Sequence, residues 1–311
     1  MSHLDRPLLG IALMLGFCAL APLGDALAKL LGPEMGVGQL VLLRFALQAL
    51  ILLPIALATG RSMRVDRRTL ARVVLRTVLH IAGIATVFTA LLYLPLADAV
   101  AIAFVMPFIM LLMGHYILGE EVGWRRLAAC AVGFSGTLLV IQPAFEDVGW
   151  PALLPLGVAV IFAAFMLVTR QIAPHTDPIA MQALSALIAL AIMIPAMLLG
   201  AATSTLGWTP PTATGWGLIL AMGCAGTVAH LLMTWALRYA PSATLAPMQY
   251  LEIPMATLIG WLIFADLPGP RASLGIAITI GSGLYVILRE RAMLRPAAGQ
   301  QATPRGTPPA E

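Results

Sequence analysis

Long apolar segments recur along almost the whole chain, and short polar connections separate them. A helix that crosses a bilayer needs about 20 predominantly apolar residues, and these segments have that length or come close to it. The pattern therefore predicts an all-α integral membrane protein with ten transmembrane helices. We expect the helices at residues 8–31, 37–58, 70–93, 96–117, 124–142, 152–170, 178–200, 214–238, 243–265 and 272–289.

Composition supports this fold class and excludes others. The chain has 311 residues, of which 60% are hydrophobic and 10% are charged, and its mean hydropathy is +0.94. Soluble domains have about 45–50% apolar and about 25% charged residues, so a soluble enzyme, a secreted disulfide scaffold and a disordered chain are excluded. At about 30 residues for each helix with its connection, ten helices leave no room for a sizeable soluble domain.

Positive charges concentrate in every second connection. Five arginines lie between residues 61 and 72, two more follow the fourth segment, and the alternate connection at 146–147 is acidic. Arginine-rich connections face the cytoplasm in membrane proteins, and an even number of helices returns both termini to the same side. We therefore expect both termini in the cytoplasm. Residues 296–311 are rich in proline, alanine, glycine and glutamine, which predicts a disordered cytoplasmic tail.

Two stretches of the chain are similar to each other. Residues 90–141 align without gaps on residues 236–287, which pairs Tyr93 with Tyr239 among other positions. An odd number of helices in each half makes the second half enter the membrane from the opposite side. Such an inverted repeat is common in secondary transporters. We expect the first five-helix repeat at 1–143 and the second at 149–292.

Two segments carry a resemblance to a known family. They read LLYLPLADAVAIAFVMPFIMLLMGHYILGEE, followed by GFSGTLLVI, and RYAPSATLAPMQYLEIPMATLIGWLIFADLP, followed by GSGLYVI. Over residues 8–290 the sequence resembles the EamA-type transporters of the drug/metabolite transporter superfamily. The resemblance implies ten helices in two inverted halves around a central substrate cavity. Within the family, the segments GDALAKLL and QYLEIP are similar to bacterial carriers for riboflavin and S-adenosylmethionine, which implies a bacterial inner membrane.

This resemblance implies a secondary transporter that moves a small organic metabolite by alternating access, with riboflavin or S-adenosylmethionine as the first expected substrate. The alternatives are an amino-acid or metabolite exporter of the same fold and an integral membrane enzyme. An enzyme would need clustered acids and bases at one surface, whereas here they are scattered, so we expect no catalytic residues. The sequence has no nucleotide-binding motif, so a gradient must supply the energy, with protons as the candidate coupling ion. The expected partners are the bilayer and the substrate, without nucleic acid, metal or cofactor, and the chain is expected to be a monomer or a homodimer.

Glu252 is the clearest candidate for a functional residue inside the membrane. It lies near the middle of the predicted ninth helix, two positions before Pro254, and the repeat places Met106 at the equivalent position. The fold therefore does not require an acid there. A charge inside a membrane helix is costly and normally faces protein or water. We expect Glu252 to contact the substrate or to carry a proton, and the alternative is a structural acid bonded to a neighbouring helix.

Three further charges lie within the first two predicted helices. Asp25 and Lys29 are one turn apart on the same face of the first helix, so they can neutralise each other, and Lys29 can also extend outward. Arg44 in the second helix keeps its charge and needs an acid or an anionic ligand, for which Asp25 is the expected partner. The three residues are candidates either for the cavity wall or for a structural network.

Four neutral residues complete the list of candidates. Gln249 and Tyr250 lie close to Glu252 in the sequence and can either hydrogen-bond a ligand or link helices. Trp235 offers an aromatic surface for a substrate ring, or it packs against lipid and helices. His230 can relay a proton, or it can be a helix-packing residue.

Two basic residues lie in the third predicted helix. Arg76 and His80 are one turn apart, and Arg76 is close to the predicted cytoplasmic surface. We therefore expect Arg76 to anchor this helix at that surface.

Overall fold

The computed structural model describes residues 6–118, 124–200, 206–240 and 245–299, and every regular element within these ranges is a helix. Six helices are long and apolar enough to cross a membrane, and many large apolar side chains are exposed, as in an integral membrane protein. The elements are α1 (Pro7–Leu31), α2 (Val37–Ala58), α3 (Arg67–Leu91), α4 (Leu96–Ala103), α5 (Met106–Leu118), α6 (Trp124–Val148), the 3₁₀ helix η1 (Trp150–Leu153), α7 (Leu154–Ile172), η2 (Ala173–His175), α8 (Pro178–Leu199), α9 (Ala213–Tyr239), η3 (Ala246–Leu251), α11 (Glu252–Phe264) and α12 (Pro270–Gly299).

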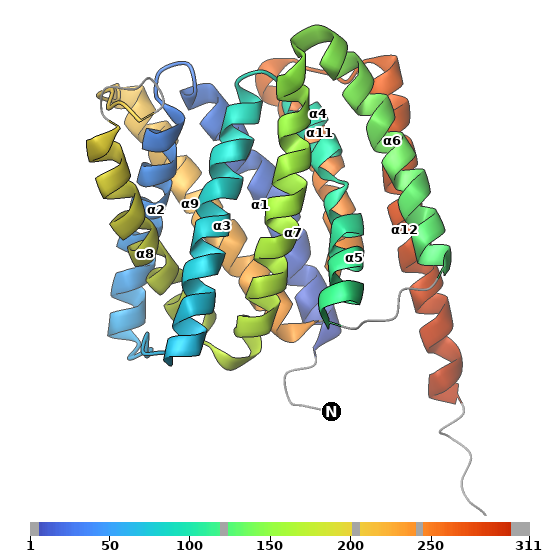
Figure 1. The fold of residues 1–311 in the computed structure, drawn as a ribbon, viewed down its shortest axis with the longest axis horizontal. Helices are drawn as coiled ribbons and strands as arrows, with labels where there is room; N and C mark the ends of the chain where they lie inside the picture. The colour runs from blue at the N-terminus through green and yellow to red at the C-terminus, as the bar shows by residue number, and fades with distance from the viewer. Residues whose placement is uncertain (1–5, 119–123, 201–205, 241–244, 300–311) are drawn as a thin grey trace, which may run out of the picture.

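The helices run alternately up and down between two ends of a bundle (Figure 1). We call the end where α1 starts and α9 finishes the lower end; there the Arg6 amide donates a hydrogen bond to the Tyr239 carbonyl, at 3.1 Å. We call the opposite end, where α2 starts, the upper end. There the Gln39 amide group exchanges hydrogen bonds of 2.7 and 2.9 Å with the backbone of Thr209. These contacts join segments that are far apart in the sequence.

Polar side chains fix the start of three helices. Asp66, before α3, accepts hydrogen bonds from the amides two and three residues later, at 3.0 and 3.3 Å. Asp177 does the same before α8, at 3.0 Å for both amides, and Thr212 accepts one at 3.0 Å before α9. Such caps satisfy first-turn amides that have no partner within the helix, so they set where each helix begins.

Two segments that were predicted as single helices are interrupted near their middles. The first is divided into α4 and α5, and Pro107 is the second residue of α5. In the second, η3 gives way to α11, and Pro254 is the third residue of α11. Proline has no amide hydrogen, so each proline removes the helical hydrogen bond to the carbonyl four residues earlier, at Ala103 and Tyr250 respectively. The backbone therefore leaves the α-helical path at these points.

Helices that are distant in the sequence pack side by side. The main pairs are α1 with α9, α3 with α7, α2 with α8, and α6 with α12 (Figure 1). Helices α6 and α12 approach closely because two glycines face each other: a Cβ on Gly275 would lie only 2.4 Å from the carbonyl oxygen of Gly136. The interrupted segments also meet, because α4 packs on α11. The Phe104 and Tyr250 rings there have centroids 5.3 Å apart.

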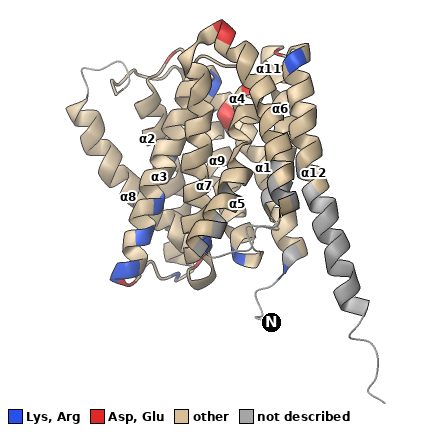
Figure 2. Ribbon diagram, turned by 45° about the vertical axis from the view of Figure 1, so that its right-hand side comes forward, with Lys and Arg blue, Asp and Glu red and all other residues tan. Residues whose placement is uncertain are grey.

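Charged residues link neighbouring segments at the lower end of the bundle. At the lower end, where Figure 2 shows several Lys and Arg positions, Arg61 forms a salt bridge with Asp177. Arg238 at the end of α9 donates to the Thr176 carbonyl, at 3.2 Å. Both contacts join connections from different parts of the chain.

The observed helix ends follow the predicted segments closely, with two extensions. Helix α2 has the predicted bounds, whereas α6 continues to Val148 and α12 continues to Gly299. The tail predicted from residue 296 therefore begins with four helical residues, and residues 300–311 lie outside the described ranges. The repeat matches predicted at 119–123 also lie outside them.

Candidate functional site

A cavity lies inside the bundle, between α1, α2, α3, α4, α7, α9 and the start of α11. The space among its lining side chains amounts to about 950 Å³, part of which is open to solvent. It reaches from His230 and Glu252, in the middle of their segments, to Leu91 and Pro155 close to the upper end. The cavity therefore occupies the upper half of the bundle.

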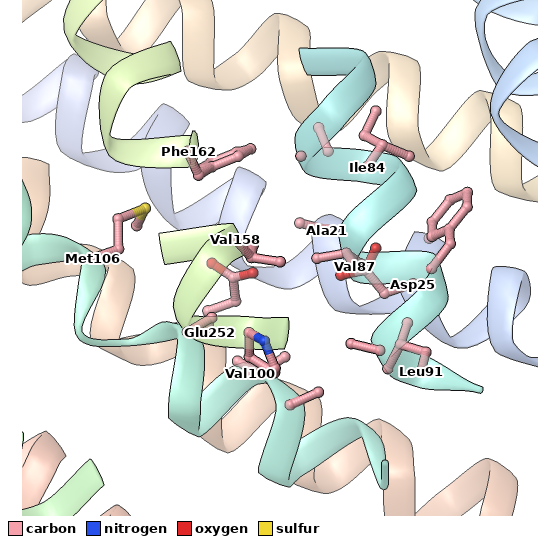
Figure 3. Close-up of a pocket in the computed structure, with 18 of the residues that line it drawn as sticks. Ala21, Asp25, Ile84, Val87, Leu91, Val100, Met106, Val158, Phe162 and Glu252 are labelled. Atoms are coloured by element: carbon pink, nitrogen blue, oxygen red, sulfur yellow. The ribbon is translucent and has the colours of Figure 1, made fainter. Parts of the chain in front are cut away.

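Four polar residues stand out among its apolar walls. They come from four different elements: Asp25 from α1, Arg44 from α2, His230 from α9 and Glu252 from α11. Figure 3 shows Asp25 and Glu252 among the apolar side chains that line this space. A mostly apolar cavity with a few convergent polar groups is typical of a binding site for a small molecule.

Glu252 reaches the cavity because of the interruption between η3 and α11. It is the first residue of α11, directly after the last residue of η3, and it lines the cavity. Asp25 comes from the continuous helix α1. Neither carboxylate accepts a hydrogen bond from the residues that the structure describes, which leaves both able to bind a cation or a donor from a ligand.

Arg44 enters the cavity past a glycine on α9. Its Nη2 donates to the Gly226 carbonyl at 3.4 Å, while its Nη1 has no hydrogen-bond partner among the described residues. A Cβ at position 226 would lie 2.7 Å from the Arg44 Nε, so a larger residue there would displace the guanidinium. The expected ion pair between Arg44 and Asp25 is not formed in the described structure, where their charged atoms are more than 4.0 Å apart.

Lys29 extends outward and does not pair with Asp25, which is the second of the two arrangements expected from the sequence. Its Nζ donates to the Leu94 carbonyl at 2.6 Å and lies 3.9 Å from an oxygen of Asp266. It also lies 5.1 Å from the centre of the Phe264 ring. Because a lysine stem is long, its charge reaches the upper end and leaves the carboxylate one turn earlier free to face the cavity.

Three other candidates lie away from the cavity walls. The Gln249 side chain is fully buried, with its Nε2 3.1 Å from the Met166 sulfur. The Tyr250 ring packs against the Phe104 ring at an interplanar angle of 47° and contributes to the packing of the two interrupted segments. Trp235 packs beside a separate apolar cluster that includes Leu52. These three residues therefore contribute to packing between helices and do not line the cavity.

His230 belongs to a buried cluster beneath the cavity. Its ring lies 4.3 Å from that of His80, between ring centroids, and His80 in turn stacks on Phe165 at 4.6 Å. Arg76, one turn from His80, is fully buried, and donates to Thr169 Oγ1 at 2.9 Å. The expectation of an anchor at the surface is therefore wrong for Arg76.

Aromatic rings in the cavity wall were not singled out from the sequence. Phe17 of α1 and Phe162 of α7 both line the cavity, and their ring centroids are 6.4 Å apart at an interplanar angle of 20°. Phenylalanine is common throughout membrane helices, so no signal in the sequence distinguishes rings that face a cavity from rings that face lipid. These two rings offer a planar ligand an apolar surface.

The fold and the cavity define an all-helical membrane protein with a mostly apolar internal cavity that a few charged side chains line. The sequence profile of the EamA-like transporter family matches residues 8–142 and again 149–289. The chain belongs to this family of transporters.

Individual relatives are transporters with different cargoes. A riboflavin transporter from Rhizobium johnstonii is 30% identical over 215 residues, covering 69% of each chain. An S-adenosylmethionine uptake transporter from Rickettsia bellii is 25% identical over 267 residues, covering 86% of this chain and 89% of the relative. A pseudopaline exporter from Pseudomonas aeruginosa is 24% identical, covering 88% and 92%. A solved crystal structure that is 19% identical covers 92% of this chain and 98% of its own with a TM-score of 0.65, which establishes likeness of fold.

Proposed function

We propose that this protein is a secondary transporter that moves a small organic metabolite across the bacterial inner membrane by alternating access. The observation that carries the proposal is the internal cavity, in which Asp25, Arg44 and Glu252 meet among apolar walls. These charges come from helices in both halves of the chain, so a movement of the halves relative to each other would change access to the site. The alternative of an integral membrane enzyme is less well supported, because the relatives are transporters.

We propose further that the helices form ten spans in two inverted halves, at 1–143 and 149–292. The family profile matches the chain twice, which supports two repeats. The proposed repeat makes α7 equivalent to α1 and α3 equivalent to α9. The packed pair α1–α9 is then equivalent to the pair α7–α3, which is packed as well. Residues that the repeat alignment makes equivalent, Met106 and Glu252, each begin a helix. The rings of the equivalent residues Phe104 and Tyr250 contact each other, as equivalent residues near a twofold axis do.

The lower end is proposed to face the cytoplasm. Its connections carry the arginine cluster at 61–72, and arginine-rich connections stay in the cytoplasm. Both termini would then be cytoplasmic, and the cavity would face the periplasm in this conformation.

The cavity fits a substrate that has both a cationic group and a flat ring. Glu252 and Asp25 supply two carboxylates for the cation, and Phe17 and Phe162 supply surface for the ring. Of the cargoes named for the relatives, S-adenosylmethionine has a sulfonium, an ammonium and an adenine ring, whereas riboflavin has a ring system without a fixed positive charge. We therefore place S-adenosylmethionine first and riboflavin second. An exporter of amino-acid-like metabolites is the alternative that the pseudopaline exporter supports.

Glu252 is proposed to carry the coupling proton, in competition with the cationic substrate. A carboxylate that faces the cavity from the middle of its segment can be exposed in turn to each side as the halves move. Protonation would release the substrate, because the neutral acid no longer attracts a cation.

The test uses the full chain in proteoliposomes, with radiolabelled S-adenosylmethionine and riboflavin offered separately. Glu252→Gln imitates the protonated acid, and Glu34→Gln, at an exposed position of the upper end, is the matched control. Because a neutral side chain no longer attracts the cation, we expect Glu252→Gln to exchange substrate only with a raised KM and to lose accumulation driven by an imposed pH gradient. Glu34→Gln should retain both activities. Accumulation by Glu252→Gln at the wild-type level would reject the proton role, and absence of both substrates from wild-type vesicles would reject the substrate assignment.

A further inference from the structure

A second group of polar side chains lies below the cavity floor, inside the lower half of the bundle. Arg76 and His80 come from α3 and are fully buried, and His230 comes from α9 with only 6% of its surface exposed. Thr169 of α7 and Ser185 of α8 accept hydrogen bonds from the Arg76 Nε and Nη1, both at 2.9 Å. Side chains of two other helices, α7 and α8, therefore hold the Arg76 guanidinium.

No acid neutralises Arg76 in the part of the chain that the structure describes. Its two hydrogen-bond partners are neutral hydroxyls, and its Cζ lies 4.6 Å from the centre of the Phe165 ring. The salt bridges formed by described residues involve Lys29 and Arg61 instead. A buried charge without a counter-charge is costly, so its retention calls for an anion that binds there at some stage.

Several side-chain nitrogen atoms in this cluster have no hydrogen-bond partner among the described residues. They include the Arg76 Nη2, both ring nitrogens of His80, and the Nδ1 of His230. A guanidinium offers only donors, and each neutral imidazole offers one donor as well as one acceptor. Such a set matches an oxyanion, whose oxygens accept several hydrogen bonds at once.

The cluster is continuous with the cavity. His230 lines the cavity and also lies 4.3 Å from His80, between ring centroids. His80 is one turn from Arg76 on α3. Arg44, which lines the cavity, has an Nη1 without a hydrogen-bond partner among the residues described. A molecule held by the carboxylates above could therefore extend an anionic group downward past His230.

We propose that Arg76, His80 and His230 form a subsite for an oxyanion, a carboxylate or a phosphate, carried by the transported molecule. The two carboxylates of the cavity hold the cationic end of the substrate, and this subsite receives its anionic end when the bundle opens at the lower end. The assignment to the transported molecule rests on the proposed function. A substrate bound in this way carries opposite charges at its two ends.

The test compares thermal unfolding of the full chain in detergent, with sodium acetate or sodium phosphate replacing sodium chloride at constant ionic strength. Arg76→Met removes the charge, and Arg72→Met is the matched control, because Arg72 is exposed and one turn away on the same helix. Wild type and Arg72→Met should show a saturable rise in Tm, on the order of 3 °C at ten times the dissociation constant. Arg76→Met should lack this rise. Arg76→Lys keeps the charge but not the planar fork, and should respond with roughly tenfold weaker affinity.

Three outcomes would overturn the proposal. The first is a Tm response of Arg76→Met equal to that of Arg72→Met, or an unchanged response of Arg76→Lys if Arg76→Met does not fold. The second is the absence of a saturable response in wild type. The third is stabilisation by phosphatidylglycerol but not by acetate or phosphate, which would assign the cluster to a lipid headgroup.

Vesicle transport separates this proposal from the proposed function. Substrate exchange by Arg76→Met at the wild-type rate and KM would reject the subsite and leave the transporter assignment standing. An oxyanion response that depends on Arg76, in a protein that transports neither offered substrate, would support the subsite while rejecting those substrates.

Discussion

Replacing Gly226 by alanine would move Arg44 without removing its charge. The added Cβ would lie 2.7 Å from Nε, 2.8 Å from Nη2 and 2.9 Å from Cζ of Arg44. An ordinary contact needs at least 3.4 Å, so the flexible Arg44 side chain must move away from position 226 by roughly 0.7 Å. The same movement lengthens the hydrogen bond from Nη2 to the Gly226 carbonyl, which is 3.4 Å at the start.

Two opposing effects determine the stability of this variant. Overpacking costs about 1–3 kcal/mol, and alanine in place of glycine in a helix contributes about 1 kcal/mol in the other direction. The free energy of unfolding should therefore fall by about 0–2 kcal/mol. A misplaced hydrogen bond from a charged group costs about 1.5–3 kcal/mol, so the KM for a substrate held by Arg44 should rise at least about tenfold.

The assay combines thermal unfolding with substrate exchange in proteoliposomes, in a double-mutant cycle with Arg44→Ala. Gly217→Ala lies on the same helix, where an added Cβ meets nothing within 4 Å, and serves as the control. In the Arg44→Ala background the alanine at 226 has room, so it should no longer lower stability. A loss of stability of the same size in both backgrounds, or an unchanged KM in Gly226→Ala, would refute the idea that this glycine positions Arg44.

Three further predictions concern the ends of the bundle. Lys29→Met should lower the free energy of unfolding by about 1 kcal/mol, because the hydrogen bond to the Leu94 carbonyl is lost. Asp266→Asn should have a smaller effect, because the ion pair between Lys29 and Asp266 is exposed on the Asp266 side. Equal effects of the two substitutions in thermal unfolding would contradict the greater importance of the hydrogen bond. The hydrogen bond with Thr69 holds the pKa of Asp66 below its usual range, so the stability that Asp66 contributes is present above the usual pKa and is lost as the pH falls through the lowered value. Asp66→Ala should therefore lower Tm at pH 7. A difference in Tm from wild type that persists at pH 2 would argue against the cap. Cysteines introduced at Arg64 and Asp147, both exposed, should react with an impermeant reagent from the cytoplasmic and periplasmic sides respectively, and the reverse labelling would invert the proposed orientation.

Helix positions were predictable from the sequence because membrane helices are set by local composition. The extent of the apolar segment at 37–58 predicted both ends of α2. The polar side chains of Asp66 and Asp177 cap α3 and α8 and define where these helices begin. The division between α4 and α5 was not predicted, because the apolar pattern continues across it. It depends on Pro107, and a proline in a membrane helix produces a kink or a break according to its neighbours.

Side-chain partners were less predictable than helices. Glu252, Asp25 and Arg44 were identifiable as charges inside apolar segments, and all three line the cavity. Lys29 looked equivalent by the same criterion, yet its flexible stem takes its charge to Asp266, which is far away in the sequence. The position of Arg76 within the third helix was predicted correctly, but its burial between helices was not. Its burial depends on Thr169 and Ser185, residues of two other helices that no pattern within α3 reveals.

The paired helix starts at Met106 and Glu252 have a consequence for how such proteins can diversify. Both residues begin a helix where the backbone leaves the α-helical path, and both line the cavity, yet one is apolar and the other acidic. The backbone geometry is thus duplicated, while the chemistry is carried on one side only. A substitution at either start can change the charge of the cavity while the proline-dependent break that presents the side chain stays in place, so the chemistry of the cavity can vary without a change in its backbone.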